Sequence, residues 1–269
     1  MQEKSFNHIT KDTRVCILSS GGLDSLISYH YAKQFTDNVI CLWVNHAHPY
    51  ANKEREALNK YGHPVTLIDL PMLKMKDYMY DYPTYDKQVV PGRNMWLATI
   101  AANFGDVIWV NALKGELVKT MPDKNHTFFT MASAVLSYTF EHDKVVESPF
   151  EFMTKVDIVR WALDHGIDAE TLKATSSCYD DNIRNCGKCG TCFKRHIAMI
   201  TNGIEEEYAE DPFTSKYASN LLHRFTTGYD PDYRVRETLN AYKITNQLDF
   251  VVNTIGKEEL DKLVEKYGV

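Results

Sequence analysis

The sequence lacks any apolar segment long enough to cross a membrane. Although 44% of its 269 residues are hydrophobic, the apolar runs, such as the one around residues 107–110, have only the length of a strand. A helix that spans a bilayer needs about 20 such residues. The polar residues 1–13 also lack the apolar stretch and small-residue cleavage site of a secretory signal peptide. We therefore expect a soluble, cytoplasmic protein with no membrane partner.

The sequence also lacks the excess of positive charge that is typical of nucleic-acid-binding proteins. Its 30 Lys and Arg residues face 36 Asp and Glu residues, and residues 200–269 alone hold 8 of the former and 13 of the latter. A net charge of −6 disfavours sustained binding to a polyanion. We expect no nucleic-acid partner, although a local basic patch stays open on this argument.

Cysteine is sparse, and the six cysteines fall into two groups. Cys16 and Cys41 lie in apolar, strand-like runs and are expected in the core. The other four are crowded between residues 178 and 192. Because a reducing cytosol keeps thiols free, this crowding favours a metal site over disulfides.

The crowded cysteines follow the pattern C-x7-C-x2-C-x2-C and are Cys178, Cys186, Cys189 and Cys192. Gly187 and Gly190 supply the tight turns that a metal-binding knuckle needs. Four thiolates fill a tetrahedral site, which predicts a structural zinc ion that helps to fold the loop and does not activate water. Two alternatives stay open: an iron–sulfur cluster, with His196 as a substitute ligand, and unligated thiols.

Strand-like and helical segments alternate through the first half of the chain. We expect strands over residues 14–18, 39–44, 65–69 and 107–112, and helices over 23–35, 52–61, 93–104 and 127–140. This order predicts an α/β fold, with a parallel sheet covered by helices on both faces. The loops that leave the strands, at Ser19, Asn45 and Ala112, then share the edge where such sheets bind ligands.

The second half of the chain is expected to be helical around the cysteine loop. A helix is predicted from Glu151 to Gly166, and further helices over residues 205–208, 215–225, 234–248 and 257–267. We expect three parts: an α/β domain over 1–170, the four-cysteine segment over 171–200 and an acidic helical extension over 201–269. The extension could cap a pocket, mediate dimerisation or receive a partner.

The first expected strand runs directly into a glycine-containing loop, Ser19-Ser20-Gly21-Gly22-Leu23-Asp24-Ser25, and then into a helix. The two glycines permit a tight turn and leave N–H groups at the positive end of the helix, which suits an anion. Ser20 and Ser25 add hydroxyl donors, and Asp24 offers a carboxylate to a magnesium ion. The alternative is a plain turn in which a serine or the aspartate caps the helix. The loop has neither Walker nor GxGxxG spacing.

The segment SGGLDS after a strand resembles the signature of the N-type ATP pyrophosphatases, or PP-loop enzymes. In that superfamily the loop holds the pyrophosphate part of ATP while the α-phosphate is attacked. The resemblance implies ATP and Mg²⁺ as cofactors and residues 1–170 as the nucleotide-binding domain. The residues that it implies for nucleotide binding are Ser19, Ser20, Gly21, Gly22, Leu23, Asp24, Ser25 and Arg93.

Further segments resemble one branch, the QueC-type 7-cyano-7-deazaguanine synthases. They are Val90-Pro91-Gly92-Arg93-Asn94, Thr175-Ser176-Ser177-Cys178-Tyr179 and Cys186-Gly187-Lys188-Cys189-Gly190-Thr191-Cys192. Arg93 could present its guanidinium to a phosphate or carboxylate, or pair with a nearby acid. Lys155 in FMTKVDIVRWA matches a family lysine that could neutralise phosphate charge, or it is a solvated helix residue. The resemblance implies Asp24, Ser25, Arg93 and Lys155 as catalytic residues.

The resemblance weakens where the family binds its substrate. Of the family segment DYSGYPDCRPEF, only Pro122, Asp123 and Phe128 align, and Lys119 stands where the family has a serine. We expect Lys119, Asp123 and Phe128 to bind the acceptor. Either Glu116 or Asp123 replaces the missing carboxylate that would accept two N–H bonds from a guanine-like edge, or the substrate differs. The family's YGQ segment is also replaced, here by residues 44–48.

The resemblance implies a Rossmann-like PP-loop fold and an ATP-dependent carbon–nitrogen ligase. Such an enzyme adenylates a deazapurine carboxylate, releases pyrophosphate and uses ammonia to make an amide and then a nitrile. We expect a homodimer. Two other functions stay open: a PP-loop enzyme that modifies a macromolecule, such as a tRNA, and a binding module that has lost its chemistry.

Overall fold

The computed structural model describes residues 3–45, 51–70, 92–116, 122–180 and 185–269. The chain divides into two compact units, residues 1–154 and 155–269. This boundary lies earlier than the one expected near residue 170. The division of the second half at residue 200 stays a prediction about folding units.

The first unit is built on the expected parallel sheet, whose five strands lie in the order β3-β2-β1-β4-β5. The strands are β1 (Val15–Leu18), β2 (Val39–Asn45), β3 (Val65–Asp69), β4 (Val107–Trp109) and β5 (Val145–Glu147). Every neighbouring pair is parallel, and Cys16 is in register with Ile40 on one side and Ile108 on the other. The predicted α/β fold is confirmed. The edge strand β5 was not predicted, because three residues after a charged turn carry no periodic signal.

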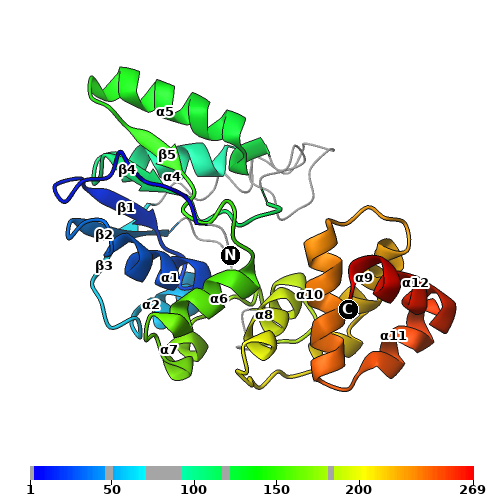
Figure 1. Ribbon diagram of the computed structural model, residues 1–269. Coiled ribbons are helices and arrows are strands. Elements are labelled where there is room, and N and C mark those ends of the chain that lie inside the picture. The colour runs from blue at the N-terminus through cyan, green and yellow to red at the C-terminus, as the bar shows by residue number, and fades with distance from the viewer. Residues whose placement is uncertain (1–2, 46–50, 71–91, 117–121, 181–184) are drawn as a thin grey trace. The chain divides into compact units, whose positions relative to one another are not determined.

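Helices cover both faces of this sheet (Figure 1). The helices of the unit are α1 (Leu23–Ala32), α2 (Ala51–Leu58), α4 (Arg93–Ala101) and α5 (His126–Phe140), with the 3₁₀ turn η2 (Pro122–Lys124) before α5. On one face Cys16, Leu42 and Ile108 pack with residues of α4 and α5 in a single apolar cluster. On the other face Trp109 contacts Tyr31 of α1, and Trp43 donates a hydrogen bond to Glu54 of α2.

The second unit is helical. Its elements are α6 (Lys155–Asp164), α7 (Ala169–Ala174), α8 (Gly190–Thr201), η3 (Pro212–Thr214), α9 (Lys216–Phe225), α10 (Asp232–Ile244), α11 (Leu248–Ile255) and α12 (Lys257–Tyr267). The first helix begins at Lys155 and not at Glu151 as expected. Residues 151–154 belong instead to a turn in which Met153 donates its N–H to Phe150 and accepts one from Lys114.

The helix expected over residues 205–208 is wrong. The chain there forms no helix, and the burial of its side chains alternates: Ile204 is buried, Glu206 and Tyr208 are half-buried, and Glu205 and Glu207 are exposed. This period of two is that of an extended segment and not of a helix. The helix expected over 234–248 is α10, which ends at Ile244, shortly before Asn246 with its φ of 55°, and α11 (Leu248–Ile255) was not predicted.

Among the described residues, no helix combines the length and hydrophobicity that a membrane span requires.

Candidate nucleotide site and metal centre

The loop from Ser19 to Ser25 leaves the central strand of the sheet and leads into α1. Its strand, β1, pairs with β2 on one side and β4 on the other. The connections therefore run in opposite directions from this point, and ligands of α/β proteins bind at such a switch point beside the carboxyl ends of the strands. The structure thus places the glycine loop where the fold offers a ligand site (Figure 1).

Gly21 makes this loop possible in two ways. Its φ is +74°, in the region that residues with a Cβ rarely adopt. A Cβ at this position would also lie 2.8 Å from the carbonyl oxygen of Glu54 in α2. Both the turn and the close approach of α2 therefore require glycine.

The loop is held from inside by Ser25 and Tyr61. The Ser20 N–H donates to Ser25 Oγ over 3.3 Å, and this hydroxyl lies 3.1 Å from the Gly22 carbonyl oxygen and 3.0 Å from Tyr61 Oη. Tyr61 in turn donates to the Gly22 carbonyl over 2.7 Å. Ser25 and Tyr61 are both buried, so the loop is fixed before any ligand arrives. Tyr61 lies outside every sequence motif, so no signal indicated this role.

The N–H groups on the outer side of the loop stay available to a ligand. Gly22 is the N-cap residue of α1 and makes no side-chain capping bond, so the interpretation of a serine- or aspartate-capped turn is wrong. Within the described chain, no acceptor is recorded for the N–H groups of Gly21, Gly22 and Leu23. Ser20 is exposed, and Asp24 is half-buried in the first turn of the helix. Free N–H groups at a helix start form a site for an anion such as a phosphate.

Arg93 begins α4, directly after Gly92, which takes the left-handed conformation with a φ of 72°. The residue is half-buried, and no described carboxylate lies within 4.0 Å of its guanidinium. The described residues therefore give no support to the surface ion pair that was the alternative. Val90 and Pro91 lie outside the described residues.

The strand ends are tied together by Asn111, which no sequence motif indicated. Asn111 follows β4 and donates its amide to the carbonyl oxygen of Leu18 at the end of β1, over 2.8 Å. Its amide oxygen accepts a hydrogen bond from Ser28 in α1 over 2.5 Å. A polar residue at a strand exit is the only signal that could have indicated it.

The acceptor segment is described in part. Asn94, beside Arg93, donates a 2.9 Å hydrogen bond to the backbone carbonyl of Asp123, which places Asp123 next to the start of α4. Phe128 is half-buried against the apolar cluster beneath α4 and α5. Lys119 lies outside the described residues, as do His46, Ala47 and His48 of the segment that replaces YGQ.

Lys155 is the first residue of α6 and therefore the first residue of the second unit. It is half-buried. Its proposed role toward a phosphate remains a prediction.

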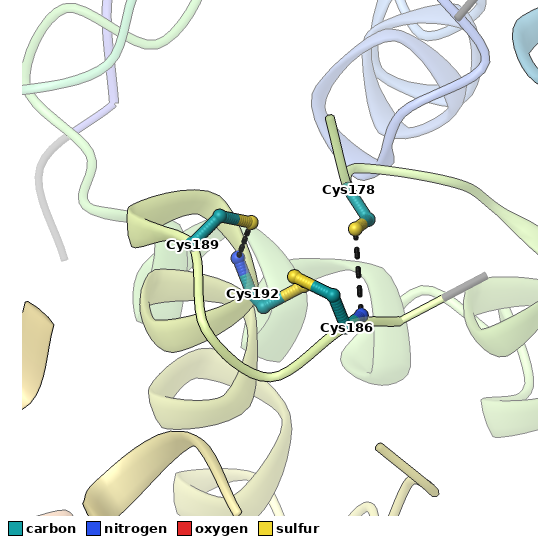
Figure 2. Close-up of side chains that lie close together, drawn as sticks. All are labelled: Cys178, Cys186, Cys189 and Cys192. Carbon is teal, nitrogen blue, oxygen red and sulfur yellow. Dashed lines mark hydrogen bonds between the residues drawn. The ribbon is translucent and has the colours of Figure 1, made fainter. Parts of the chain in front are cut away.

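The four clustered cysteines converge on one point (Figure 2). Their sulfur atoms all lie within 4.8 Å of one another, and those of Cys186 and Cys192 are 3.9 Å apart. Four sulfurs around a zinc ion with bonds of about 2.3 Å lie about 3.8 Å apart. The residues present therefore fit a tetrahedral metal ion.

Backbone geometry prepares these sulfurs to carry negative charge. Cys178 Sγ accepts N–H groups from Asp180 and Cys186, and Cys189 Sγ accepts that of Cys192, each over 3.4 Å. Hydrogen bonds from Cys178 and Cys192 lower the pKa of Cys189. A Cβ on Gly187 would overlap the backbone of Glu210, so this knuckle requires its glycine.

A buried arginine links the TSSCY segment to the extended chain after α8. Arg195 is 1% exposed and pairs with Glu206 through Nε–Oε2 at 2.8 Å. Its Nη1 donates to Thr175 over 2.7 Å and to Ser177 over 3.4 Å. The ion pair explains why the Glu206 side chain is less exposed than those of its neighbours. The hydrogen bonds from Arg195 give Thr175 and Ser177 a structural role.

The remaining histidine and cysteines do not join the cluster. His196 packs between Tyr208 and Phe213 and is not among the described ligand group, which consists of the four cysteines. Cys16 and Cys41 are buried in the sheet as expected. Burial raises the pKa of Cys41 to about 12 and that of Cys16 still higher, so neither is a ready nucleophile.

Comparisons with known proteins match most of the chain to one family. The model of the family described as "Queuosine biosynthesis protein QueC" matches residues 14–203, which hold the loop, Arg93, Lys155 and the cysteines. A 7-cyano-7-deazaguanine synthase of Methanocaldococcus jannaschii is 28% identical over 70% of this chain and 95% of its own length. One of Sulfolobus acidocaldarius is 27% identical over 72% of this chain but 47% of its own length, so the chain spans about half of that relative.

Among solved structures, the NAD+ synthetase of Burkholderia pseudomallei aligns with a TM-score of 0.30 and 17% identity, over 60% of this chain and 62% of the synthetase. A similarity at this level carries no weight for fold or function.

Proposed function

The chain belongs to the QueC family, and on this premise we propose that it is an ATP-dependent enzyme that adenylates the carboxylate of a deazapurine. The single observation that carries the proposal is the preformed glycine loop at the start of α1. Its N–H groups of Gly21, Gly22 and Leu23 have no recorded acceptor within the described chain, and residues 14–203 match the family. A preorganised set of N–H donors at a helix start stabilises phosphate charge.

The proposed reaction has two activations. An oxygen of the carboxylate of 7-carboxy-7-deazaguanine, or of a related or attached deazapurine, attacks the α-phosphorus of ATP, and pyrophosphate leaves. Ammonia then attacks the acyl carbon and AMP leaves, which gives the amide. In the second activation the amide oxygen attacks the α-phosphorus of another ATP and pyrophosphate leaves. Loss of AMP and of both N–H protons of the amide then gives the nitrile.

The protein's part in this chemistry is to position charges and neutralise them. In this proposal the loop N–H groups and the Ser20 hydroxyl hold the departing pyrophosphate, and Asp24 binds Mg²⁺. Ser25 acts within the loop, because its buried hydroxyl already bonds to Ser20 and Gly22. Arg93 and Lys155 supply positive charge to the phosphates.

The proposed acceptor site lies on the segment that follows β4. Lys119, Asp123 and Phe128 are its proposed contacts. Support comes from Asn94, which ties the backbone of Asp123 to the start of α4 beside Arg93. The acceptor carboxylate and the nucleotide must meet, and this bond holds the backbone of Asp123 beside the start of α4, as the proposal requires.

Zinc is the proposed ion of the four-cysteine site. When bound, it supplies folding energy to the loop from Cys178 to Cys192. All four coordination positions are then filled by protein, so the site has no catalytic part in the proposal.

We also propose a homodimer in the cytoplasm. The support is α5, whose 15 residues include no Asp, Glu, Lys or Arg. Its outward stripe of Met131, Val135 and Tyr138 is exposed by 63%, 49% and 86%. An uncharged stripe can pair with its own copy without burying a charge. The mass in solution of wild type and of Tyr138→Asp tests this, and a monomeric wild type would refute it.

The test of the function is a product assay. The full chain is incubated with ATP, Mg²⁺, ammonium and 7-carboxy-7-deazaguanine, and pyrophosphate, AMP and the deazapurine product are measured. The proposal requires pyrophosphate release that depends on the acceptor, with amide or nitrile found by mass spectrometry. Release that an RNA acceptor stimulates and the free deazapurine does not would favour modification of a macromolecule instead.

A further inference from the structure

Glu151 is a buried carboxylate with an unused acceptor. The residue is 8% exposed. Its Oε2 accepts no hydrogen bond, and it is the only carboxylate oxygen in this condition among the buried side-chain atoms that the structure describes. A buried acceptor without a donor costs free energy, so a side chain in this state is expected to have a donor that arrives with a ligand.

The neighbouring cations do not fill this need. Lys4 Nζ is 3.6 Å from Oε1 of Glu151 but 3.0 Å from Glu147, which also accepts from His8 and from the Trp109 indole. Glu147 lies at the same strand end and is also buried, but its carboxylate already accepts hydrogen bonds. The Oε2 of Glu151 instead faces His126 Nδ1 at 3.6 Å, beyond hydrogen-bonding distance. His126 is 67% exposed, so Oε2 faces a side chain that ligand binding can displace.

Glu151 lies at the edge of the sheet where the acceptor is proposed to bind. It follows β5, and the loop that carries it is joined to the loop after β4. Ser148 donates its hydroxyl to the Ala112 carbonyl, and Lys114 donates its N–H to the Met153 carbonyl over 2.9 Å. The loop after β4 continues into the acceptor segment, whose residue His126 faces Glu151.

The other carboxylates of these two loops already have hydrogen-bond donors or are open to water. Glu116 Oε2 accepts from the Leu113 N–H over 3.3 Å and from Lys124 over 3.4 Å. Asp123 is half-exposed, so water can bind its carboxylate. Of these carboxylates, Glu151 is the buried one that still lacks a donor. A hydrogen bond from an incoming N–H group therefore stabilises it most.

We propose that Glu151 recognises the acceptor base by accepting hydrogen bonds from its N1–H and exocyclic amino group. This inference rests on the proposed function, because that function supplies an acceptor with a guanine-like edge. Two parallel N–H groups match the two oxygens of a carboxylate. Glu151 then replaces the carboxylate that this chain lacks in the segment after β4, and it determines the specificity of the site.

Equilibrium binding to the full chain tests the proposal without relying on turnover. The probes are 7-deazaguanine and 7-deazahypoxanthine, which lacks the exocyclic amino group, and ATP affinity is measured in parallel. A paired set of hydrogen bonds to a base edge discriminates by about tenfold or more. Wild type is therefore expected to prefer 7-deazaguanine by about that factor. In Glu151→Gln, whose amide N–H₂ opposes one donor, the preference falls toward unity while ATP binding stays unchanged.

Glu116→Gln is the matched control, since it makes the same change in the carboxylate that is already bonded, and it is expected to keep the preference. If Glu151→Gln fails to fold, Glu151→Asp withdraws the carboxylate by one methylene and is expected to lower the preference too. An unchanged preference in a folded Glu151 variant, or a wild type that binds neither base, overturns the inference. Pyrophosphate release separates the two proposals: binding with the expected selectivity but no release refutes the function alone, and release with unchanged selectivity refutes the role of Glu151 alone.

Discussion

The hydroxyl group of Tyr61 donates a 2.7 Å hydrogen bond to the carbonyl oxygen of Gly22, 39 residues earlier in the chain. Tyr61 follows α2, and Gly22 is the N-cap of α1. The bond orients a peptide group at the start of α1, where the glycine loop turns. The packing of α2 on the sheet therefore determines the shape of the proposed phosphate site.

Tyr61→Phe is expected to weaken ATP binding more than it weakens the fold. The ring keeps its packing, but the Gly22 carbonyl loses a donor and the loop loses one of its fixed points. A net hydrogen bond of this kind contributes about 1 kcal/mol, so we expect the KM for ATP to rise about fivefold with a small loss of melting temperature. Steady-state kinetics and thermal unfolding check this. An unchanged KM would show that the loop does not depend on Tyr61.

Gly21→Ala is expected to destabilise the protein and abolish ATP turnover. The new Cβ meets the Glu54 carbonyl at 2.8 Å and stands on a backbone with a φ of +74°. Gly62→Ala is the matched control, because Gly62 has a φ of +70° but nothing within 4 Å of a Cβ. We expect a loss of about 1 kcal/mol in the control and about 2–4 kcal/mol at Gly21, measured by denaturant unfolding. Equal losses would mean that α2 does not press on the loop.

The sequence predicted the elements that carry strong local signals. The alternation of strands and helices, the glycine loop and the cysteine spacing all come from short-range patterns, and helix α12 has the bounds that were expected, Lys257–Tyr267. The residues that were missed act through tertiary contacts. Tyr61 and Asn111 are single polar residues whose roles depend on which strand end or helix lies beside them. The segment at 205–208 looked helical, and it is extended because Glu206 pairs with the buried Arg195.

From the four-cysteine site we expect one zinc ion per chain. Cys186→Ser is expected to lose the metal and several kcal/mol of stability, because binding and folding of the loop are coupled. Cys41→Ser, which changes a cysteine outside the cluster, is expected to keep the zinc. Elemental analysis of the purified protein checks both variants. Iron with labile sulfide in the wild type would contradict the assignment.

Substitutions in the acceptor segment are expected to affect the KM for the acceptor and not the KM for ATP. Asp123→Asn and Lys119→Met are expected to raise the KM for the acceptor about tenfold or more while the KM for ATP changes less than twofold, since lost polar contacts to one ligand cost about 1–3 kcal/mol. Initial rates with each substrate varied in turn give both constants. Equal losses for ATP would place these side chains in the nucleotide site.

Because His63 is harder to protonate in the folded chain than in the unfolded chain, we expect the stability of the fold to decrease as the pH falls. Burial lowers the pKa of His63 to about 4, and its ring is stacked on Tyr29 with centroids 3.6 Å apart. The unfolded chain binds a proton near pH 6.5, so between pH 6.5 and 4 it holds more protons than the folded chain, and stability falls with falling pH. Because the ring is partly exposed, we expect a contribution of about 1–2 kcal/mol. Urea unfolding of wild type and His63→Gln at pH 7 and pH 4.5 checks this, and parallel losses in the two proteins would refute the assignment.

The proposed function rests on the attack of an acceptor carboxylate on the α-phosphorus of ATP in the glycine loop. The most direct measurement uses 7-carboxy-7-deazaguanine labelled with ¹⁸O in both carboxylate oxygens, together with ATP, Mg²⁺ and ammonium, and follows the label by mass spectrometry. One ¹⁸O is expected in each AMP and none in pyrophosphate, and Asp24→Ala is expected to abolish the transfer while it leaves the fold intact. Unlabelled AMP, label in inorganic phosphate formed with ADP, or normal transfer in a folded Asp24→Ala protein would contradict the proposed attack.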